Sequence, residues 1–457
     1  MSKLFVVSNR VIQDGVREGG EGGLTTAVWS MLKDLHGSWI GWSGSVSDDE
    51  SVQLKMASGV AIYTTDMSDR AYEKNYCGFA NACLWPLFHE RLDLVRYDES
   101  DFSSYMDYNR RIAMVLSELA QPEDLIWVHD YHFLPLAQIC RDLGMNQRIG
   151  FFLHTPFPPP SVISALPNHW QSMKTLLSYS LVGVQSGFDA ENLQSYLRQQ
   201  SDGNKASEPL VAAFPISIDT RGVISSALAC TGSSDFGSET KRSSVRIFSA
   251  DRMDYSKGFI NRILAYDQFL SKRSDPCPDI QYCLVAPDSR ENISEYRNHK
   301  SEVMLLLLEV QQRWRDDYEN CIEMINQPVA PEPLLAMMRA SQVGFIAPLR
   351  DGMNLVAKEY IAAQNPVDPG VLIVSKFCGA GRELPRAGLI AVNPHDISEM
   401  ARALEEAVVM PRTERVRRHR LLMSHLLEYD VKWWARSYLK SLQAESCLSM
   451  SDTSVTV

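Results

Sequence analysis

Residues 343–359 place a buried strand, a turn and the start of a helix in one short stretch. The apolar run 343–347 indicates a buried parallel strand, and the turn that follows, RDGMNLVAKE at 350–359, opens a helix. Unpaired backbone N–H groups at such a turn favour a phosphate, and Gly352 lets the backbone approach closely. Asp351 and Glu359 flank these donors, and carboxylates accept hydrogen bonds from hydroxyls. The combination suggests a sugar nucleotide, with hydroxyls at each end and a diphosphate between them.

The same alternation of short apolar runs and helical patterns recurs along the chain and predicts an α/β fold with parallel sheets covered on both faces. It is interrupted by a stretch rich in Ser, Gly and Thr, and we place a linker at 231–243. The chain therefore predicts two doubly wound domains, residues 1–235 and 236–430, with a C-terminal helix at 430–450 packing back on them. Strands are expected at 4–7, 39–42 (with 43–44 as its turn), 125–128, 148–153, 180–184, 245–248, 280–285, 322–325, 343–347, 371–374 and 389–392.

Charge and cysteine content restrict the class of protein. The chain has 457 residues, a net charge of -11 and nine scattered cysteines. An acidic chain is a poor general binder of nucleic acid or of membrane surfaces, so an anionic ligand must be held by local clusters of Arg and Lys. An odd number of cysteines inside apolar runs is typical of reduced thiols, and no apolar run is long enough to span a membrane. We expect a cytoplasmic protein without disulfides.

Titratable residues follow several of the predicted strands, more than a core needs. His129, Asp130 and His132 end one strand, and His154 ends the next. A glycine-rich loop at 15–23 follows the first strand; a mobile surface loop is an equally good interpretation of its sequence. Its position still favours a ligand-binding role, because ligands bind outside the carboxyl ends of parallel strands.

With these segments in order, the chain resembles the retaining glucosyltransferases that make trehalose 6-phosphate from a nucleotide-activated glucose and glucose 6-phosphate. The likeness runs from Ser2 to about Tyr438 and implies the GT-B fold, two facing Rossmann-like domains with a cleft between them. Each segment alone is weak evidence, but eight in the family's order are strong. They are 8–10, 21–24, 39–44, 75–76 with 84–86, 127–132, 151–154, 252–258, and 350–364.

On the donor side, the resemblance implies that Arg252 and Lys257 hold the diphosphate and stabilise it as it leaves. A planar guanidinium and a point ammonium charge suit that task. It further implies that Glu359 binds the ribose and that Asp351 and His154 bind the transferred glucose. The remaining donor-binding positions are the flexible Gly22 and Gly23 and the backbone N–H groups of Gly352, Met353, Asn354, Leu355 and Val356.

On the acceptor side, the resemblance implies a phosphate site at Arg10, Tyr76 and Arg290, with Trp39 nearby. Trp85 and Asp130 are expected on the acceptor sugar, because a sugar ring stacks on indole and a carboxylate accepts hydroxyl protons. For Trp85, a purely structural role in the core is a close competitor. Since Arg290 belongs to the second domain, an acceptor bound by both halves would favour closure.

The expected mechanism follows from missing groups. A retaining glycosidase needs two carboxylates about 5 Å apart, one of them a nucleophile, and the sequence offers no convincing nucleophile. The family is thought to react on one face of the sugar, so catalysis would be positioning plus electrostatic stabilisation. No Asp-x-Asp metal motif occurs, so we expect no metal and no cofactor. Two residues depart from the family's pattern, Thr155 and Ser217.

Two other functions remain open. The same chemistry could act on a different phosphorylated acceptor, such as glycerol phosphate or a cyclitol phosphate, because a few loop residues decide acceptor choice. The chain could also be a silent sugar-phosphate sensor, although silent relatives tend to lose the charged groups that are present here. We expect UDP-glucose as the donor, although the sequence itself does not determine the nucleobase. The chain could also form a homo-oligomer.

Overall fold

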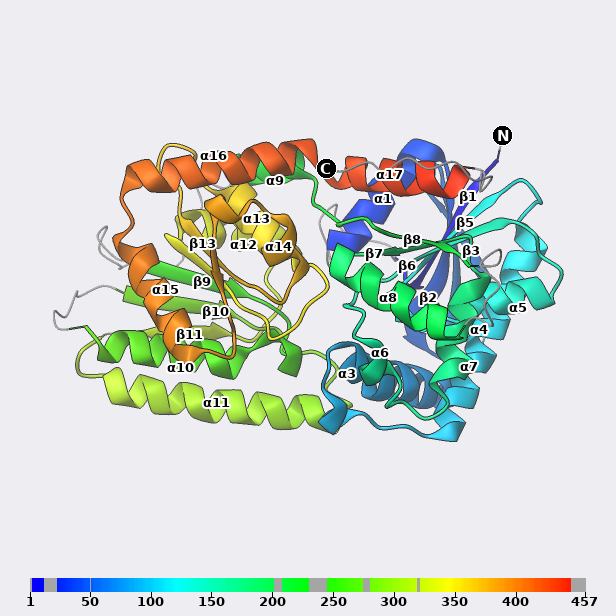
Figure 1. Cartoon of the computed structure of the whole chain (residues 1–457), viewed down its shortest axis with the longest axis horizontal. Helices are drawn as coiled ribbons and strands as arrows, with labels where there is room; N and C mark the ends of the chain where they lie inside the picture. The colour runs from blue at the N-terminus through cyan, green and yellow to red at the C-terminus, as the bar shows by residue number, and fades with distance from the viewer. Residues whose placement is uncertain are drawn as a thin grey trace.

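The computed structural model describes residues 2–11, 23–49, 51–200, 208–229, 245–273, 280–318 and 321–444. It contains two α/β halves that lie side by side (Figure 1). Each half is built on its own sheet, and all strand pairs but one are parallel. The predicted α/β fold with two facing Rossmann-like domains is confirmed.

The first sheet has eight strands in the order β3-β4-β2-β1-β5-β6-β7-β8. Successive residues of β1 face opposite layers: Phe5 and Val7 pack in one apolar cluster, and Leu4 and Val6 pack in another. This explains why the buried strands are apolar throughout rather than alternating. The strands are β1 (Leu4–Arg10), β2 (Ser38–Val46), β3 (Gln53–Ala57), β4 (Val60–Met67), β5 (Leu125–His129), β6 (Arg148–Phe152), β7 (Leu181–Val184) and β8 (Leu210–Ala213).

The second sheet has six parallel strands in the order β11-β10-β9-β12-β13-β14. Its strands are β9 (Val245–Ala250), β10 (Ile280–Val285), β11 (Ile322–Ile325), β12 (Val343–Ile346), β13 (Val371–Ser375) and β14 (Ile390–Val392). In each sheet the strand order reverses at the first strand of the half: β1 lies between β2 and β5, and β9 lies between β10 and β12. Ligands bind at such switch points, outside the carboxyl ends of the strands.

Helices cover both faces of each sheet. One apolar cluster contains side chains from both halves, and α16 and α17 both contribute to it. The helices of the first half are α1 (Gly23–Leu35), α2 (Asp69–Ala71), α3 (Trp85–Phe88), α4 (Glu99–Leu119), α5 (Leu136–Asp142), α6 (Pro160–Ile163), α7 (His169–Met173) and α8 (Gly187–Gln200). The later ones are α9 (Thr220–Ala229), α10 (Phe259–Ser271), α11 (Ser294–Trp314), α12 (Pro331–Ala340), α13 (Leu355–Ala363), α14 (Gly379–Glu383), α15 (Ile397–Val409), α16 (Arg412–Glu428) and α17 (Val431–Gln443).

The segment between β2 and α3 differs from the sequence prediction. Ser43 and Gly44 do not form a turn, because β2 continues through them to Val46, with an irregular register and a positive φ of 93° at Gly44. The strands β3 and β4 and the π-helix η1 (Tyr72–Leu84) were not predicted at all. The side chains of β3 are largely exposed, so that strand lacks the apolar signature on which the other predictions depend.

Two helices pack away from the strands that precede them. The helix α9 lies within the range 1–235 that we assigned to the first domain, yet it packs on α12, α13 and α16 of the second half. The helix α17 returns in the other direction and lies over the first half (Figure 1), where Trp434 packs edge-on against Phe152 of β6. The expected linker at 231–243 lies outside the described residues.

The chain crosses between the halves twice, and the two crossings lie against each other. The N–H of Val431 donates to the carbonyl of Ile218 at 3.0 Å, and the Thr220 hydroxyl donates to the carbonyl of Leu426 at 2.8 Å. Beneath them the fully buried ammonium of Lys358 donates to the carbonyl of Ile216 at 2.8 Å. The two crossings are therefore held by hydrogen bonds to each other and by one from Lys358 of α13, the helix that begins in the 350–359 turn.

The charge of Lys358 is balanced by buried partners. Its Nζ lies 2.9 Å from Oε2 of Glu383, and Oε1 of Glu383 lies 2.6 Å from Nε2 of His425. Burial lowers the pKa of Lys358. Although burial alone would raise the pKa of Glu383, Lys358 holds it below its ordinary value. Removing one member of such a group leaves the other charge buried and unpaired.

None of the described helices combines the length and the apolar character that a membrane-spanning segment needs.

Replacing Lys358 with Met should destabilise the protein by about 3–5 kcal/mol, because it strands the buried Glu383 carboxylate. Arg110→Ala is the control, since its exposed ion pair with Asp107 contributes about 0–1 kcal/mol. Urea unfolding followed by tryptophan fluorescence measures both variants. An unfolding midpoint of Lys358→Met equal to that of Arg110→Ala would show that the buried pair does not hold the crossing.

Candidate functional site

The predicted site residues gather where the carboxyl ends of the two sheets face each other. Asp130 follows β5, Arg252 follows β9 and Asp351 follows β12, which are the strands at or beside the two switch points. The halves meet here: a Cβ atom built on Gly352 would lie 1.8 Å from the carbonyl oxygen of His154. Gly352 is therefore required by the contact between the halves, and its role in binding a ligand stays a prediction.

An ion pair joins the loops after β9 and β12. Nζ of Lys257 lies 2.5 Å from Oδ2 of Asp351, and their side chains are only 10% and 13% exposed. Although burial alone would lower the pKa of Lys257, Asp351 and Asp251 hold it above its ordinary value. Asn354 Nδ2 donates to Asp351 at 3.2 Å and to Asp251 at 3.0 Å. The loop carrying Lys257 and the 350–359 turn therefore form one unit.

The 350–359 turn has the geometry expected of a phosphate site. Asn354 has a positive φ of 71°, and its side chain caps α13 by accepting from the N–H of Ala357 at 3.4 Å. The next N–H groups, of Leu355 and Val356, are in the first turn of the helix, where no intrahelical acceptor exists. Met353 is buried beside them. The helix thus presents backbone donors and the positive end of its dipole.

Glu359 lies one turn further into α13, and among the described residues its carboxylate has no hydrogen-bond or ion-pair partner. Burial raises the pKa of its carboxyl to about 7. A half-buried carboxylate without partners keeps its full capacity to accept hydrogen bonds. It can therefore bind hydroxyl groups of a ligand lying on the helix.

Two arginines of the second half meet a tryptophan of the first. The guanidinium of Arg290 lies 4.2 Å from the ring centroid of Trp85, and that of Arg252 lies 5.5 Å from it. Trp85 is 6% exposed, whereas Arg252 is exposed. The face of Trp85 that was expected to stack on an acceptor sugar is approached by cations in this structure.

Arg290 reaches across the boundary between the halves. Its Nη1 donates to the hydroxyl of Tyr296 at 2.5 Å, and its Nη2 donates to the hydroxyl of Tyr131 in the first half at 3.2 Å. Nη1 also lies 3.8 Å from Oδ2 of Asp254. Burial alone would raise the pKa of Asp254, but Arg290 and Arg252 lower it to about 2. Arg290 is thus a built-in cation of the interface between the halves.

A second cationic corner lies at the end of β1. The guanidinium of Arg10 is exposed and lies 5.5 Å from the ring centroid of Trp42, which in turn lies 5.3 Å from Tyr76. Tyr76 stacks on His132 at 6.2 Å. Trp39 does not join them: it is 1% exposed, and its indole N–H donates to the Ser8 hydroxyl at 2.8 Å. Trp39 therefore supports β1 from the neighbouring strand β2, and its place near a ligand stays a prediction.

Asp130 is held in an unusual backbone conformation next to His154. Its φ is 74°, and Oδ1 accepts from the backbone N–H of His154 at 3.1 Å. Burial raises the pKa of Asp130 to about 6 and lowers that of His154 to about 3. Strained non-glycine residues persist where the surroundings over-determine them, often at functional sites.

Some predicted site residues make no contact described above, and some residues of the site were not predicted. Gly22 lies outside the described residues, and Gly23 begins α1. The hydroxyls of the two departures, Thr155 and Ser217, are buried without a hydrogen-bond partner. Sequence reasoning assigned no role to Tyr131, Asp254, Tyr296 or His129, although all of them except Tyr296 lie inside the segments that carry the family resemblance.

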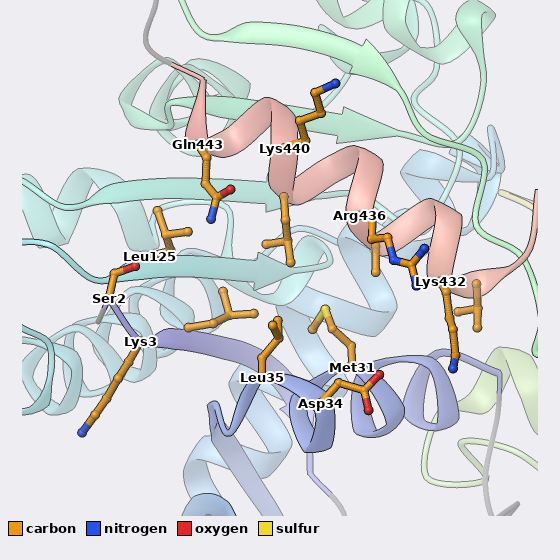
Figure 2. A pocket seen from close by; sticks show the side chains of 14 residues that line it. Ser2, Lys3, Met31, Asp34, Leu35, Leu125, Lys432, Arg436, Lys440 and Gln443 are labelled. Carbon is orange, nitrogen blue, oxygen red and sulfur yellow. The ribbon is translucent and has the colours of Figure 1, made fainter.

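Two observations concern the rest of the molecule. Within the described ranges, no group of three or more His, Cys, Asp or Glu side chains could hold a metal ion. A groove of about 340 Å³ lies between α1 and α17, with Asp34, Lys432 and Arg436 at its rim (Figure 2). None of the predicted site residues lines it.

Comparisons with known proteins agree with this geometry. The model of glycosyltransferase family 20 matches residues 7–444. A trehalose-6-phosphate synthase of Sinorhizobium fredii is 38% identical over 98% of this chain and 99% of its own. A UDP-forming α,α-trehalose-phosphate synthase of Burkholderia vietnamiensis has a TM-score of 0.93 at 35% identity, covering 97% of this chain and 99% of that one. One of Burkholderia xenovorans in complex with glucose 6-phosphate has a TM-score of 0.89 at 36% identity, covering 97% and 100%.

The raised pKa of Glu359 predicts a pH-dependent stability difference. In the folded protein the carboxyl ionises near pH 7, but in the unfolded chain it ionises near its ordinary value of 4.5, so this group weakens folding as pH rises through that window. Glu359→Gln cannot ionise. Its melting temperature should equal that of the wild type below about pH 4.5 and exceed it increasingly up to about pH 7. The exposed Glu332→Gln is the control, and a Glu359→Gln curve parallel to the wild type would contradict the assignment.

Proposed function

Because the chain belongs to glycosyltransferase family 20, we propose that it transfers glucose from UDP-glucose to glucose 6-phosphate with retention, giving α,α-trehalose 6-phosphate and UDP. In this reaction the bond between the anomeric carbon and the donor phosphate breaks. A bond forms from that carbon to the acceptor hydroxyl oxygen, and the hydroxyl proton passes to the departing phosphate. The observation that carries the proposal is the buried Lys257–Asp351 pair, which holds an ammonium group against the 350–359 turn.

The donor is proposed to lie along α13. Its diphosphate meets the ammonium of Lys257, the guanidinium of Arg252 and the N–H groups of Gly352, Met353, Asn354, Leu355 and Val356. The ribose hydroxyls donate to Glu359, which has free acceptor capacity. As the phosphate departs it gains negative charge, and fixed cations beside it stabilise that charge without reorganising. No cofactor is needed for this step on our proposal, since the nucleotide-sugar is itself the activated substrate.

The transferred glucose is proposed to lie between the halves. Asp351 and His154 approach it from the two sides, and the contact at Gly352 brings their loops together. Closing the cleft removes water, which strengthens every electrostatic contact inside it.

The acceptor is proposed to bind from the side of the first half. Its phosphate would be held by Arg10, Tyr76 and Arg290. Its sugar would be held by Asp130 and Trp85, and Trp39 of β2 would support the neighbouring strand β1. The complex of the Burkholderia xenovorans enzyme with glucose 6-phosphate supports this choice of acceptor. The name of the Burkholderia vietnamiensis enzyme, UDP-forming, supports the choice of nucleotide.

Retention is proposed to occur without a covalent intermediate. A nucleophilic carboxylate must be free to attack, but Asp351 is engaged with Lys257 and Asn354, and Asp130 accepts from the His154 backbone. Attack by the acceptor on the face from which the phosphate leaves needs no nucleophile. Positioning and leaving-group stabilisation then supply the rate enhancement.

Two other functions are distinguishable by experiment. Incubation with UDP-glucose and a panel of acceptors (glucose 6-phosphate, glycerol phosphate, a cyclitol phosphate) while UDP release is followed identifies the acceptor. Glucose 6-phosphate should give the fastest release. A protein that binds sugar phosphates but releases no UDP with any acceptor would instead be a sensor.

Arg252→Ala should lower kcat by roughly 10²–10³-fold, because it removes a charge that stabilises the departing phosphate. Glucose 6-phosphate binding, measured by calorimetry, should remain. The control is Arg315→Ala, which removes an arginine of the same half whose side chain is 80% exposed. Unchanged turnover in Arg252→Ala, with glucose 6-phosphate still bound, would contradict the proposed function and favour the sensor.

A further inference from the structure

Two buried histidines at the site form a direct pair. His129 is the last residue of β5, and His154 follows β6, the strand next to it. Nδ1 of His129 lies 3.0 Å from Nε2 of His154, and the ring centroids are 5.3 Å apart. His129 is fully buried, whereas His154 is half-buried. His129 therefore cannot touch a ligand in this arrangement, but it engages one nitrogen of a residue that can.

The two rings are neutral. Burial and His154 lower the pKa of His129, and burial lowers the pKa of His154 to about 3. A neutral imidazole carries one proton, so in this bond one ring donates and the other accepts. Which ring donates decides whether Nδ1 of His154, the only ring nitrogen left for a ligand, bears a hydrogen.

The surroundings of His129 decide between these arrangements. Its other nitrogen, Nε2, is buried without a partner. Aromatic rings surround the imidazole of His129, with centroid-to-centroid distances of 4.6 Å to Trp127, 6.4 Å to Phe152 and 6.3 Å to Trp434. The indole N–H groups of Trp127 and Trp434 are also buried without a partner, and an indole can only donate.

The buried indole N–H groups of this cluster thus have no acceptor. A proton on Nε2 of His129 would add a third buried N–H with nothing to receive it, and orphaned buried N–H groups are rarer than orphaned acceptors. The proton of His129 is therefore more stable on Nδ1, where it donates to Nε2 of His154. His154, neutral and accepting at Nε2, then carries its own proton on Nδ1.

We propose that His129 is a positioning residue that fixes the proton of His154 on Nδ1, so that His154 donates a hydrogen bond to the sugar of the bound nucleotide-glucose. The identity of this ligand rests on the proposed function; the position of the proton does not. The consequence is that the sugar oxygen opposite His154 accepts a hydrogen bond.

Nitrogen-15 NMR of protein labelled in its histidines tests the proton directly, because protonated and bare ring nitrogens resonate in separate regions. We expect a bare Nε2 and a protonated Nδ1 for His154. His129→Phe removes the donor while keeping a ring in the cluster. The nitrogen-15 resonances of the His154 ring should therefore change. His169→Phe is the matched control, because His169 of the same half also bonds through Nδ1, to the Tyr196 hydroxyl at 2.6 Å, and lies in α7.

Kinetics supply a readout that a merely structural role would not move. His129→Phe should lower kcat/KM for UDP-glucose roughly 10-fold, the worth of one hydrogen bond, with KM for glucose 6-phosphate unchanged. His129→Asn should recover most of the loss, because its amide N–H can donate to Nε2 of His154. His169→Phe should match the wild type in both constants.

These experiments distinguish a failure of the proton assignment from a failure of the proposed function. A wild-type His154 with its proton on Nε2 would overturn the inference without any substrate being present. So would a His129→Phe protein whose His154 signals and kcat/KM for UDP-glucose are those of the wild type. If the wild type shows the expected proton position but releases no UDP, the proposed function fails and the assignment of the proton stands.

Discussion

The ion pair of Lys257 and Asp351 is the interaction on which the site depends. It joins the loop after β9 to the turn after β12 across a distance of 2.5 Å in a nearly buried setting. Two charges taken out of water are stable there only with good geometry and further hydrogen bonds. Asn354 supplies these bonds by donating to both Asp351 and Asp251, and Asp251 lies 3.1 Å from the buried guanidinium of Arg262. The site's positive charge is thereby fixed in place before any ligand arrives.

The second constraint is that the halves touch at the same place. Gly352 accommodates the carbonyl of His154, Arg290 bonds Tyr131, and Trp85 lies beside two arginines of the other half. The first half thus contributes hydroxyls, aromatic faces, histidines and the guanidinium of Arg10, and the second half contributes further cations and a helix N-terminus. A sugar nucleotide and a sugar phosphate need both sets of groups, so neither half would suffice alone.

The sequence predicted the parts of this site that depend on local pattern. Buried parallel strands are apolar throughout, so their carboxyl ends, and the residues at Asp130, Arg252 and Asp351, could be located from the chain alone. The exposed strand β3 and the π-helix η1 have no such pattern, and both were missed. Gly352 lies against the backbone carbonyl of His154, which belongs to the other half and stands 198 positions earlier in the chain. No local sequence pattern records a contact over that separation.

Burial caused the other differences. Trp39 belongs to a motif of the family and was expected near a ligand, but its place in the middle of the first sheet turns its indole to Ser8. His129 lies in a quoted motif and differs from its neighbour Asp130 in facing the aromatic cluster under α17. Whether a polar side chain at a strand's end faces the cleft or the core follows from the packing of α17, which the strand's own sequence does not specify.

The most direct test of the account is a crystal structure of the protein with UDP and glucose 6-phosphate bound. We predict that the diphosphate lies within hydrogen-bond distance of the guanidinium of Arg252 and the ammonium of Lys257, over the N-terminus of α13. A diphosphate bound elsewhere, with both side chains turned away from it, would contradict the claim that these two cations neutralise the leaving group.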